Sequence, residues 1–413
     1  MRLLGLIFCI GLAFHCDIGA AKPFKKVLVI SGGGVNPGLA LGIIAGVQEK
    51  GWRPDLIIAT CGAGIGSAIY NSEQSIAGSF EVLRSWEFYK TLSRIEIETP
   101  NGLDMFDKLK KAKNTFVYPS LFAGNLLHAP EEFFLQLKNP EFNQNPALPK
   151  VIILSARAFF GPSQVGQVRP FAPIFQQVYF TDAGTAEYLK GRKLPKKYSY
   201  PFTTLTEDTL AISEHDTITA SRAGGADPYL LNPSLVDGYY HFSGAVDLFP
   251  LDLAVSLGDE VVATYPASLF QDYEDVAVVS GFGFKQTTRA LEAIQHKDVK
   301  WIDISGADDL SFNPSRLILL MRSGIPTDFT EFQLGVGKQW SFGRDRANEA
   351  IRMASGKVTD IRFHLRKPIN PKLAEDFSCK NANEWKTDQR DSCVNDKSAE
   401  CNRALAKKCV PIR

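Results

Sequence analysis

The sequence predicts an α/β domain built on a doubly wound, mainly parallel sheet with helices on both faces. The segments 25–31, 56–59 and 151–155, each built around a short apolar run, have the length of buried strands. They alternate with segments whose apolar residues recur at helical spacing, as in residues 39–50. Because strands that alternate with helices favour a parallel sheet with covered faces, this pattern predicts the α/β class.

The other predicted elements continue the alternation. Further strands are expected at residues 177–181, 239–242, 259–265 and 298–304. Helices are expected from Ser67 onward, over 72–92, 217–226, 286–295 and 341–355.

The N-terminal segment, residues 1–21, is predicted to be a secretory signal. An arginine at position 2 precedes an apolar run over 3–14 that is too short to span a bilayer. Small residues at Ala20 and Ala21 suit cleavage. We therefore expect a secreted or periplasmic protein whose main domain covers residues 22–367.

The C-terminal tail, residues 368–413, is polar and rich in cysteine. Its cysteines are Cys379, Cys393, Cys401 and Cys409. In an oxidising compartment, clustered cysteines in a segment with few core residues predict two disulfides, with three pairings open. A four-thiolate zinc site is the alternative, but the tail has no Cys-x-x-Cys pair.

The charge balance argues against a nucleic-acid partner. The net charge is +1, so no basic excess is present to meet phosphates. A hydrophobic content of 45% and a charged content of 22% are ordinary for a globular protein.

Three glycines, Gly32, Gly33 and Gly34, directly follow the first strand and precede a helix. Dinucleotide sites begin in the same way, but the sixth position counted from Gly32 is Pro37 rather than glycine. We interpret the loop as one whose backbone N–H groups face an anion, as an oxyanion hole requires.

The second strand leads into the small-residue run 62–66. A strand, a tight turn and a helix N-terminus form a nucleophile elbow, whose sequence pattern is Gly-x-Ser-x-Gly. Both outer glycines are present as Gly62 and Gly66, but Gly64 stands at the serine position. The sequence therefore predicts the frame of an elbow without its nucleophile.

The order of four motifs resembles the patatin-like phospholipase family over about residues 25–355. The motifs are residues 27–34 with Gly42, residues 62–66, residues 220–228 and residues 240–254. The resemblance implies a patatin-like doubly wound α/β fold and lipid acyl hydrolysis by a Ser–Asp dyad, with no metal and no cofactor.

The resemblance places Gly64 at the position of the family's serine and Phe242 at that of its aspartate. The spacing to Pro250 and Ala254 sets Phe242 on the first letter of the family's Asp-Gly-Gly. Asp237, which Gly238 follows, is the other candidate for the aspartate.

Neighbouring residues are candidates to replace the dyad. They are Cys61, Ser67, Asp237, His241 and Ser243. Three of them also have a structural interpretation: Cys61 as a small buried hydrophobe, Ser67 as a packing or capping residue, and Asp237 as a turn residue.

The sequence thus favours an exported family member without the dyad, acting as a lipid-binding or interaction module. A lipid or fatty acyl ligand, a peripheral membrane and a protein are the candidate partners. The alternative is a lipid acyl hydrolase that uses displaced residues such as Cys61, Ser67 or Asp237.

Overall fold

The computed structural model describes most of the chain between residues 21 and 352. The described residues are 21–32, 36–97, 117–122, 125, 127–130, 137–143, 145–169, 172–194, 205–228, 231–265, 299–310, 312 and 328–352. The predictions for the signal up to residue 20, for Gly33 and Gly34, for a helix over 286–295 and for the tail with its four cysteines lie outside these residues.

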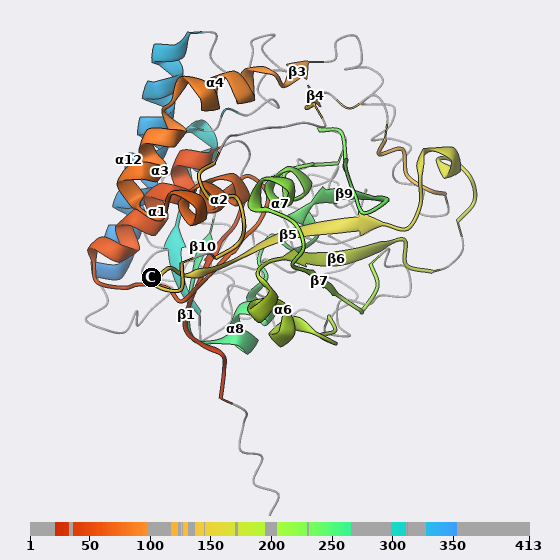
Figure 1. Cartoon of the computed structure of the whole chain (residues 1–413), viewed down its shortest axis with the longest axis horizontal. Coiled ribbons are helices and arrows are strands. Elements are labelled where there is room, and N and C mark those ends of the chain that lie inside the picture. The colour runs from red at the N-terminus through yellow and green to blue at the C-terminus, as the bar shows by residue number, and fades with distance from the viewer. Residues whose placement is uncertain are drawn as a thin grey trace, which may run out of the picture.

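A nine-stranded sheet forms the centre of the fold (Figure 1). Its strand order is β11-β10-β1-β2-β5-β6-β7, and β9 pairs with both β5 and β8. The strands are β1 (Phe24–Ile30), β2 (Leu56–Ala59), β5 (Lys150–Ala158), β6 (Phe175–Phe180), β7 (Leu210–Ile212), β8 (Ser234–Val236), β9 (Tyr239–Ser243), β10 (Gly258–Tyr265) and β11 (Val299–Asp303). A two-stranded sheet joins β3 (Glu96–Ile97) to β4 (Leu127–His128).

The run from β11 to β5 is parallel, whereas β6 and β9 lie antiparallel to β5. The predicted α/β class with a mainly parallel sheet is therefore confirmed. β5 is long enough to pair first with β2 and then, beyond the end of β2, with β9. The end of β9 thus lies next to the segment that follows β2.

Helices cover both faces of the sheet. They are α1 (Pro37–Glu49), α2 (Ala63–Glu73), α3 (Ile76–Leu83), α4 (Trp86–Ser93), α6 (Ala183–Leu189), α7 (Thr217–Gly224), α8 (Leu251–Leu257) and α12 (Phe329–Arg352). Successive strand side chains alternate between two cores. Leu28 and Ile30 pack with the apolar residues of α1, α2, α7 and α12, whereas Val27 and Val29 pack with those of α8.

Three predicted helices have wrong boundaries. The final helix, predicted over 341–355, begins at Phe329. The helix after β2 begins at Ala63, four residues before Ser67. The helix predicted over 72–92 is three helices, because Ser75 and Ser85 are N-caps whose side chains accept hydrogen bonds from the N–H groups of Gly78 and Phe88. Serine side chains that bond to the backbone in this way favour helix starts over helix interiors.

Glycines allow α12 to pack closely along α1, so that the two helices run beside each other on one side of the sheet (Figure 1). A Cβ atom on Gly42 would lie 2.1 Å from the carbonyl oxygen of Trp340. A Cβ atom on Gly38 would lie 2.7 Å from the carbonyl oxygen of Val336. The contact between these helices therefore requires the missing side chains.

Gly42→Ala is expected to lower the free energy of unfolding by about 1–3 kcal/mol, because the two helix backbones must move apart to admit the methyl group. Gly337→Ala on α12 is the matched control, since a Cβ atom there meets no described atom within 4 Å. Alanine at position 337 is expected to raise the free energy of unfolding by about 1 kcal/mol through helix propensity. Urea denaturation measures the free energy of unfolding of both variants. If Gly42→Ala and Gly337→Ala changed it in the same direction, the close packing of α1 on α12 would be contradicted.

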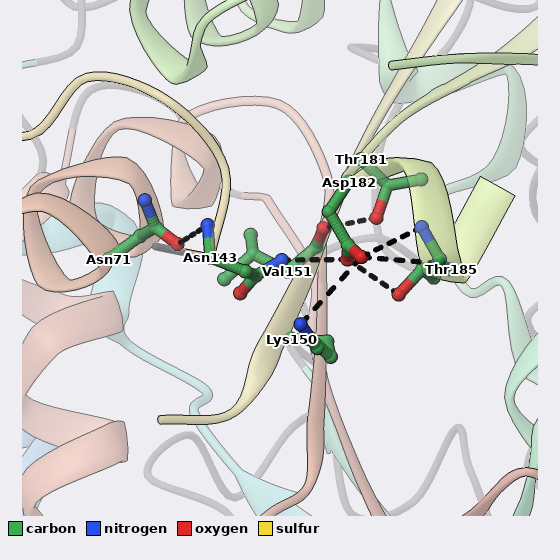
Figure 2. A network of polar contacts seen from close by, with 8 residues as sticks. Asn71, Asn143, Lys150, Val151, Thr181, Asp182 and Thr185 are labelled. Atoms are coloured by element: carbon green, nitrogen blue, oxygen red, sulfur yellow. Dashed lines mark hydrogen bonds and ion pairs between the residues drawn. The ribbon is translucent and has the colours of Figure 1, made fainter. Parts of the chain in front are cut away.

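A polar network ties the start of β5 to the end of β6 (Figure 2). Asp182 is the N-cap of α6 and accepts hydrogen bonds from the N–H groups of Gly184 and Thr185. Its carboxylate also accepts from the Asn143 amide at 2.8 Å and lies 3.7 Å from the Lys150 ammonium. This network lies at the amino-terminal end of β5, away from the turn after β2, so we assign it a structural role.

Candidate functional site

Cys61 lies at the apex of the turn between β2 and α2. Its φ of 51° is a left-handed backbone conformation that few residues other than glycine adopt. Such a conformation costs about 1–3 kcal/mol and is concentrated at functional sites. A nucleophile elbow holds its reactive side chain at the same strand-to-helix turn. The geometry of the elbow is therefore present, with Cys61 at its tip.

Gly64, which the sequence analysis places at the serine position, lies in the first turn of α2. A Cβ atom on Gly64 would lie 3.2 Å from Cγ2 of Ile153 and 3.8 Å from the Ser221 hydroxyl oxygen. A side chain at position 64 would therefore face the packing between α2, β5 and α7. The difference arises because α2 begins at Ala63, so that Gly64 is part of the helix instead of the turn.

Asp227 presents its carboxylate to the Cys61 thiol. The Sγ atom lies 3.4 Å from Oδ2 and 3.6 Å from Oδ1, within hydrogen-bonding distance for sulfur. Asp227 follows α7 in a loop that the backbone fixes to β9, since the N–H of Ser243 donates to the carbonyl oxygen of Ala226 at 2.8 Å. This bond explains how two segments far apart in the chain bring a carboxylate to the turn.

Ser243 is the third polar side chain of the cluster. It is the last residue of β9, is fully buried, and hydrogen-bonds with both Cys61 and Asp227. Cys61 is 6% exposed and Asp227 keeps partial contact with solvent. The cluster of Cys61, Asp227 and Ser243 thus lies at the edge of the interior.

Burial controls the protonation of this pair. Burial raises the pKa of the Cys61 thiol well above its ordinary value, and the nearby charge of Asp227 raises it further. Hydrogen bonds from Ser243 and from the N–H of Gly62 act in the opposite direction. Burial also raises the pKa of Asp227, against hydrogen bonds from Ser243 and Cys61. The Cys61 thiol therefore keeps its proton at neutral pH and faces the Asp227 carboxyl group.

The glycine loop begins directly beside the thiol. A Cβ atom on Gly32 would lie 2.3 Å from Cβ of Cys61 and 3.2 Å from its Sγ atom. The N–H of Gly32 donates to the Thr60 hydroxyl at 2.9 Å, and the N–H of Ser31 donates to the Thr264 hydroxyl at 2.8 Å. These bonds hold Gly32 against Cys61, where only glycine fits.

Phe242, the residue that the resemblance sets at the aspartate position, lies in the core. It is fully buried, and its ring centroid lies 5.7 Å from that of Phe122 and 6.0 Å from that of Phe175. The next residue, Ser243, projects to the other face of β9, because successive strand residues alternate. The polar group that reaches Cys61 from β9 is therefore Ser243.

Asp237 forms the tight turn of the β8–β9 hairpin together with Gly238. Both residues have positive φ angles, 49° and 79°, as the two-residue turns of hairpins require. The Asp237 carboxylate is exposed and lies 2.8 Å from Nε2 of His215. The interpretation of Asp237 as a turn residue is confirmed, and it lies at the opposite end of β9 from Ser243.

Ser67 and His241 also lie apart from the thiol. Ser67 is fully buried on α2, and its hydroxyl meets no hydrogen-bond partner among the described residues. His241 faces the Ser155 hydroxyl at 3.2 Å. Burial and the charge of Arg157 lower the pKa of His241 to about 3, so its imidazole stays neutral.

Asp227 is the site residue that the sequence analysis missed. It stands in Asp-Pro directly after the small-residue segment 220–226, which the resemblance included only as a helix ending. Its partner Cys61 lies 166 positions away in the chain, so no local spacing connects the two.

Within the described ranges, no group of three or more histidine, cysteine, aspartate or glutamate side chains is placed to hold a metal ion. No helix in the same ranges is long and apolar enough to cross a membrane.

Comparisons with known proteins add little to this geometry. Neither a protein-family model nor a curated protein matches the chain. Among solved structures, the chain is similar to VipD from Legionella pneumophila, with 12% sequence identity and a TM-score of 0.33 over 79% of this chain and 67% of that chain. This likeness is too distant to carry an argument about function.

Proposed function

We propose that the chain is an acyl hydrolase in which Cys61 is the nucleophile and Asp227 accepts its proton. The observation that carries the proposal is the contact of 3.4 Å between the Cys61 thiol, at the apex of a strand-to-helix turn, and the Asp227 carboxylate. A nucleophile and a proton acceptor within hydrogen-bonding distance are the minimum equipment for covalent acyl transfer.

We carry the substrate class over from the patatin-like resemblance, with the elbow motif moved by three residues. When residues 59–63 are placed on the family's Gly-x-Ser-x-Gly, Cys61 takes the place of serine and Gly32 lies beside it, but Ala59 and Ala63 replace the two outer glycines. The N–H of Gly62, the residue after the nucleophile, then provides one donor of the oxyanion hole. The family's lipid esters are accordingly the first substrates to examine.

Because its pKa is raised, the Cys61 thiol is protonated before it attacks, as a serine hydroxyl is. A protonated thiol must lose its proton during attack, and the adjacent Asp227 carboxylate accepts it. A protonated thiol also reacts slowly in disulfide exchange, which depends on the thiolate. A buried Cys61 is therefore compatible with an oxidising compartment.

Export completes the proposal, on the strength of sequence pattern alone. The apolar segment 3–14 would direct the chain out of the cell, and Cys379, Cys393, Cys401 and Cys409 would pair in the tail. A membrane surface or a protein would then be the partner at which the domain acts.

Binding of an acyl lipid without turnover is the second candidate. The small exposure of Cys61, 6%, favours it, because a buried thiol suits an inert site. In this case Cys61 is a structural residue, and its contact with Asp227 has no chemical consequence.

Detection of an acyl-enzyme intermediate distinguishes the acyl hydrolase from the lipid-binding protein. We expect p-nitrophenyl octanoate to release nitrophenolate and to leave an octanoyl adduct on Cys61, detected by peptide mass spectrometry after acid quench. Cys61→Ala should lose both signals, whereas Ser67→Ala, a change on the helix that follows the turn, should keep them. Lipid that co-purifies with a chain that forms no adduct would instead establish the binding function.

A further inference from the structure

We propose that this site acts on acyl thioesters in preference to alkyl oxygen esters. The inference deepens the proposed function, since it requires Cys61 to be the nucleophile. It rests on the identity of the attacking atom and on the groups around it: the Asp227 carboxylate, the Ser243 hydroxyl and the N–H of Gly62.

The cluster contains a single group that can return a proton. Among the described residues, the side chains that reach the Cys61 thiol are Asp227 and Ser243, and the neutral imidazole of His241 faces Ser155 instead. Among the described residues, the Asp227 carboxyl that forms during attack is therefore the one acid beside Sγ. In the same part of the chain no histidine is placed to protonate the leaving group, as the histidine of a cysteine protease does.

The leaving groups decide how the tetrahedral intermediate collapses. An ordinary thiol has a pKa of about 8.5, whereas an alcohol is nearly as weak an acid as water, with a pKa of about 15.7. In the intermediate from an oxygen ester, Sγ of Cys61 leaves more readily than the alkoxide, which regenerates the substrate. In the intermediate from a thioester both leaving atoms are sulfur, so the reaction can proceed.

Burial favours the forward direction for a thioester. The Cys61 thiol has a raised pKa because of burial and the Asp227 charge, so it is a poorer leaving group than a solvated substrate thiol. The substrate thiolate therefore departs first and leaves the acyl group on Cys61.

The complete reaction balances without any other reactant. The Sγ atom forms a bond to the thioester carbonyl carbon while its proton moves to Asp227, and the bond from carbon to the substrate sulfur then breaks. Asp227 gives its proton to the departing thiolate. A water molecule next attacks the acyl-Cys61 carbonyl and transfers a proton to Asp227, the carbon–Sγ bond breaks, and Sγ recovers the proton. One thioester and one water yield one carboxylic acid and one thiol.

Octanoylthiocholine and octanoylcholine form a test pair that differs in a single atom, and a pH-stat follows acid release from both. We expect the full-length wild-type chain to show a kcat/KM at least about 100-fold higher for the thioester, after correction for uncatalysed hydrolysis. Cys61→Ser should lower this ratio at least about tenfold, because its attacking oxygen competes evenly with an alkoxide.

The possible outcomes test the thioester preference and the proposed hydrolase function separately. Equal wild-type turnover of both substrates would overturn the thioester preference and leave the hydrolase intact. Turnover of neither, with no adduct on Cys61, would overturn the proposed function itself. If Cys61→Ser does not fold, the rates at which the wild-type chain acquires the octanoyl adduct from each substrate provide the same ratio, and equal rates would reject the preference.

Discussion

Asp227→Asn is expected to lower kcat/KM for acyl turnover by about 10²–10⁴-fold, the usual contribution of a general base. The amide has the same shape as the carboxylate and preserves contacts with Cys61 and Ser243, but it cannot accept the proton of the attacking thiol. Steady-state kinetics on the substrate that forms the Cys61 adduct measures the loss.

Asp227→Asn should make the Cys61 thiol more reactive toward alkylating reagents, although it lowers acyl turnover. The charge of Asp227 and its hydrogen bond both raise the pKa of the thiol, so their removal lowers that pKa and increases the thiolate fraction. Alkylation of Cys61 by iodoacetamide should therefore become faster while acyl turnover falls. If Asp227 were only structural, the alkylation rate and the acyl turnover would not change in opposite directions.

The effect of Asp227→Asn on the free energy of unfolding is a third measurement, and the pKa shift of Asp227 predicts its sign. Burial raises the pKa of Asp227 in the folded state above its unfolded value, so its contribution to stability is fully present below the unfolded pKa and is lost as pH rises through the folded pKa. Ionisation of the Asp227 carboxyl therefore costs stability. Asp227→Asn should unfold at the same or a higher urea concentration than the wild-type chain at pH 7.

Asp237→Asn is the matched control, because Asp237 is an exposed turn residue that contacts His215 and lies away from Cys61. Asparagine also tolerates the left-handed conformation at this position. Turnover should be unchanged. Loss of turnover in Asp237→Asn together with full activity in Asp227→Asn would contradict the assignment of the base.

The strands were predictable because both faces of the sheet are buried. Residues 56–59 and 151–154 are continuous apolar runs, as strands covered on two faces require, and each lies in a strand of the structure. The helix starts were not predictable in the same way, because the glycines after β2 have low helix propensity. Gly66 serves helix packing: a Cβ atom there would lie 2.6 Å from the carbonyl oxygen of Pro37 on α1.

The candidate site was predictable in location but not in composition. The turn between residues 56–59 and the next helix was identified, yet Gly64 and Gly66 of the apparent elbow motif belong to α2, which shifts the apex from Gly64 to Cys61. The carboxylate depends on a tertiary contact between the loop after α7 and the end of β9, fixed by the bond from Ser243 N–H to Ala226. Local sequence patterns do not encode a contact of this range.

Gly32→Ala is expected to abolish most of the acyl turnover, by about 100-fold or more, because it displaces the nucleophile. The added Cβ atom would lie 2.3 Å from Cβ of Cys61 and 2.9 Å from the carbonyl oxygen of Thr60, so the glycine loop or the turn must move. A shift of about 1 Å in a catalytic group is enough for such a loss. Overpacking of this kind should also lower the free energy of unfolding by about 1–3 kcal/mol. Gly161→Ala, where a Cβ atom meets no described atom within 4 Å, is the control.

A double-mutant cycle identifies Cys61 as the cause. Cys61→Gly removes the Cβ atom that Gly32→Ala meets, and glycine also suits the φ of 51° at position 61. The destabilisation by Gly32→Ala should therefore be smaller in the Cys61→Gly background than in the wild-type chain, with an interaction energy of about 0.5–3 kcal/mol from urea denaturation. If the two substitutions changed the free energy of unfolding additively, the added methyl group at position 32 would not be in steric conflict with Cys61. Normal acyl turnover in Gly32→Ala would show that the reaction does not depend on where the loop holds the thiol.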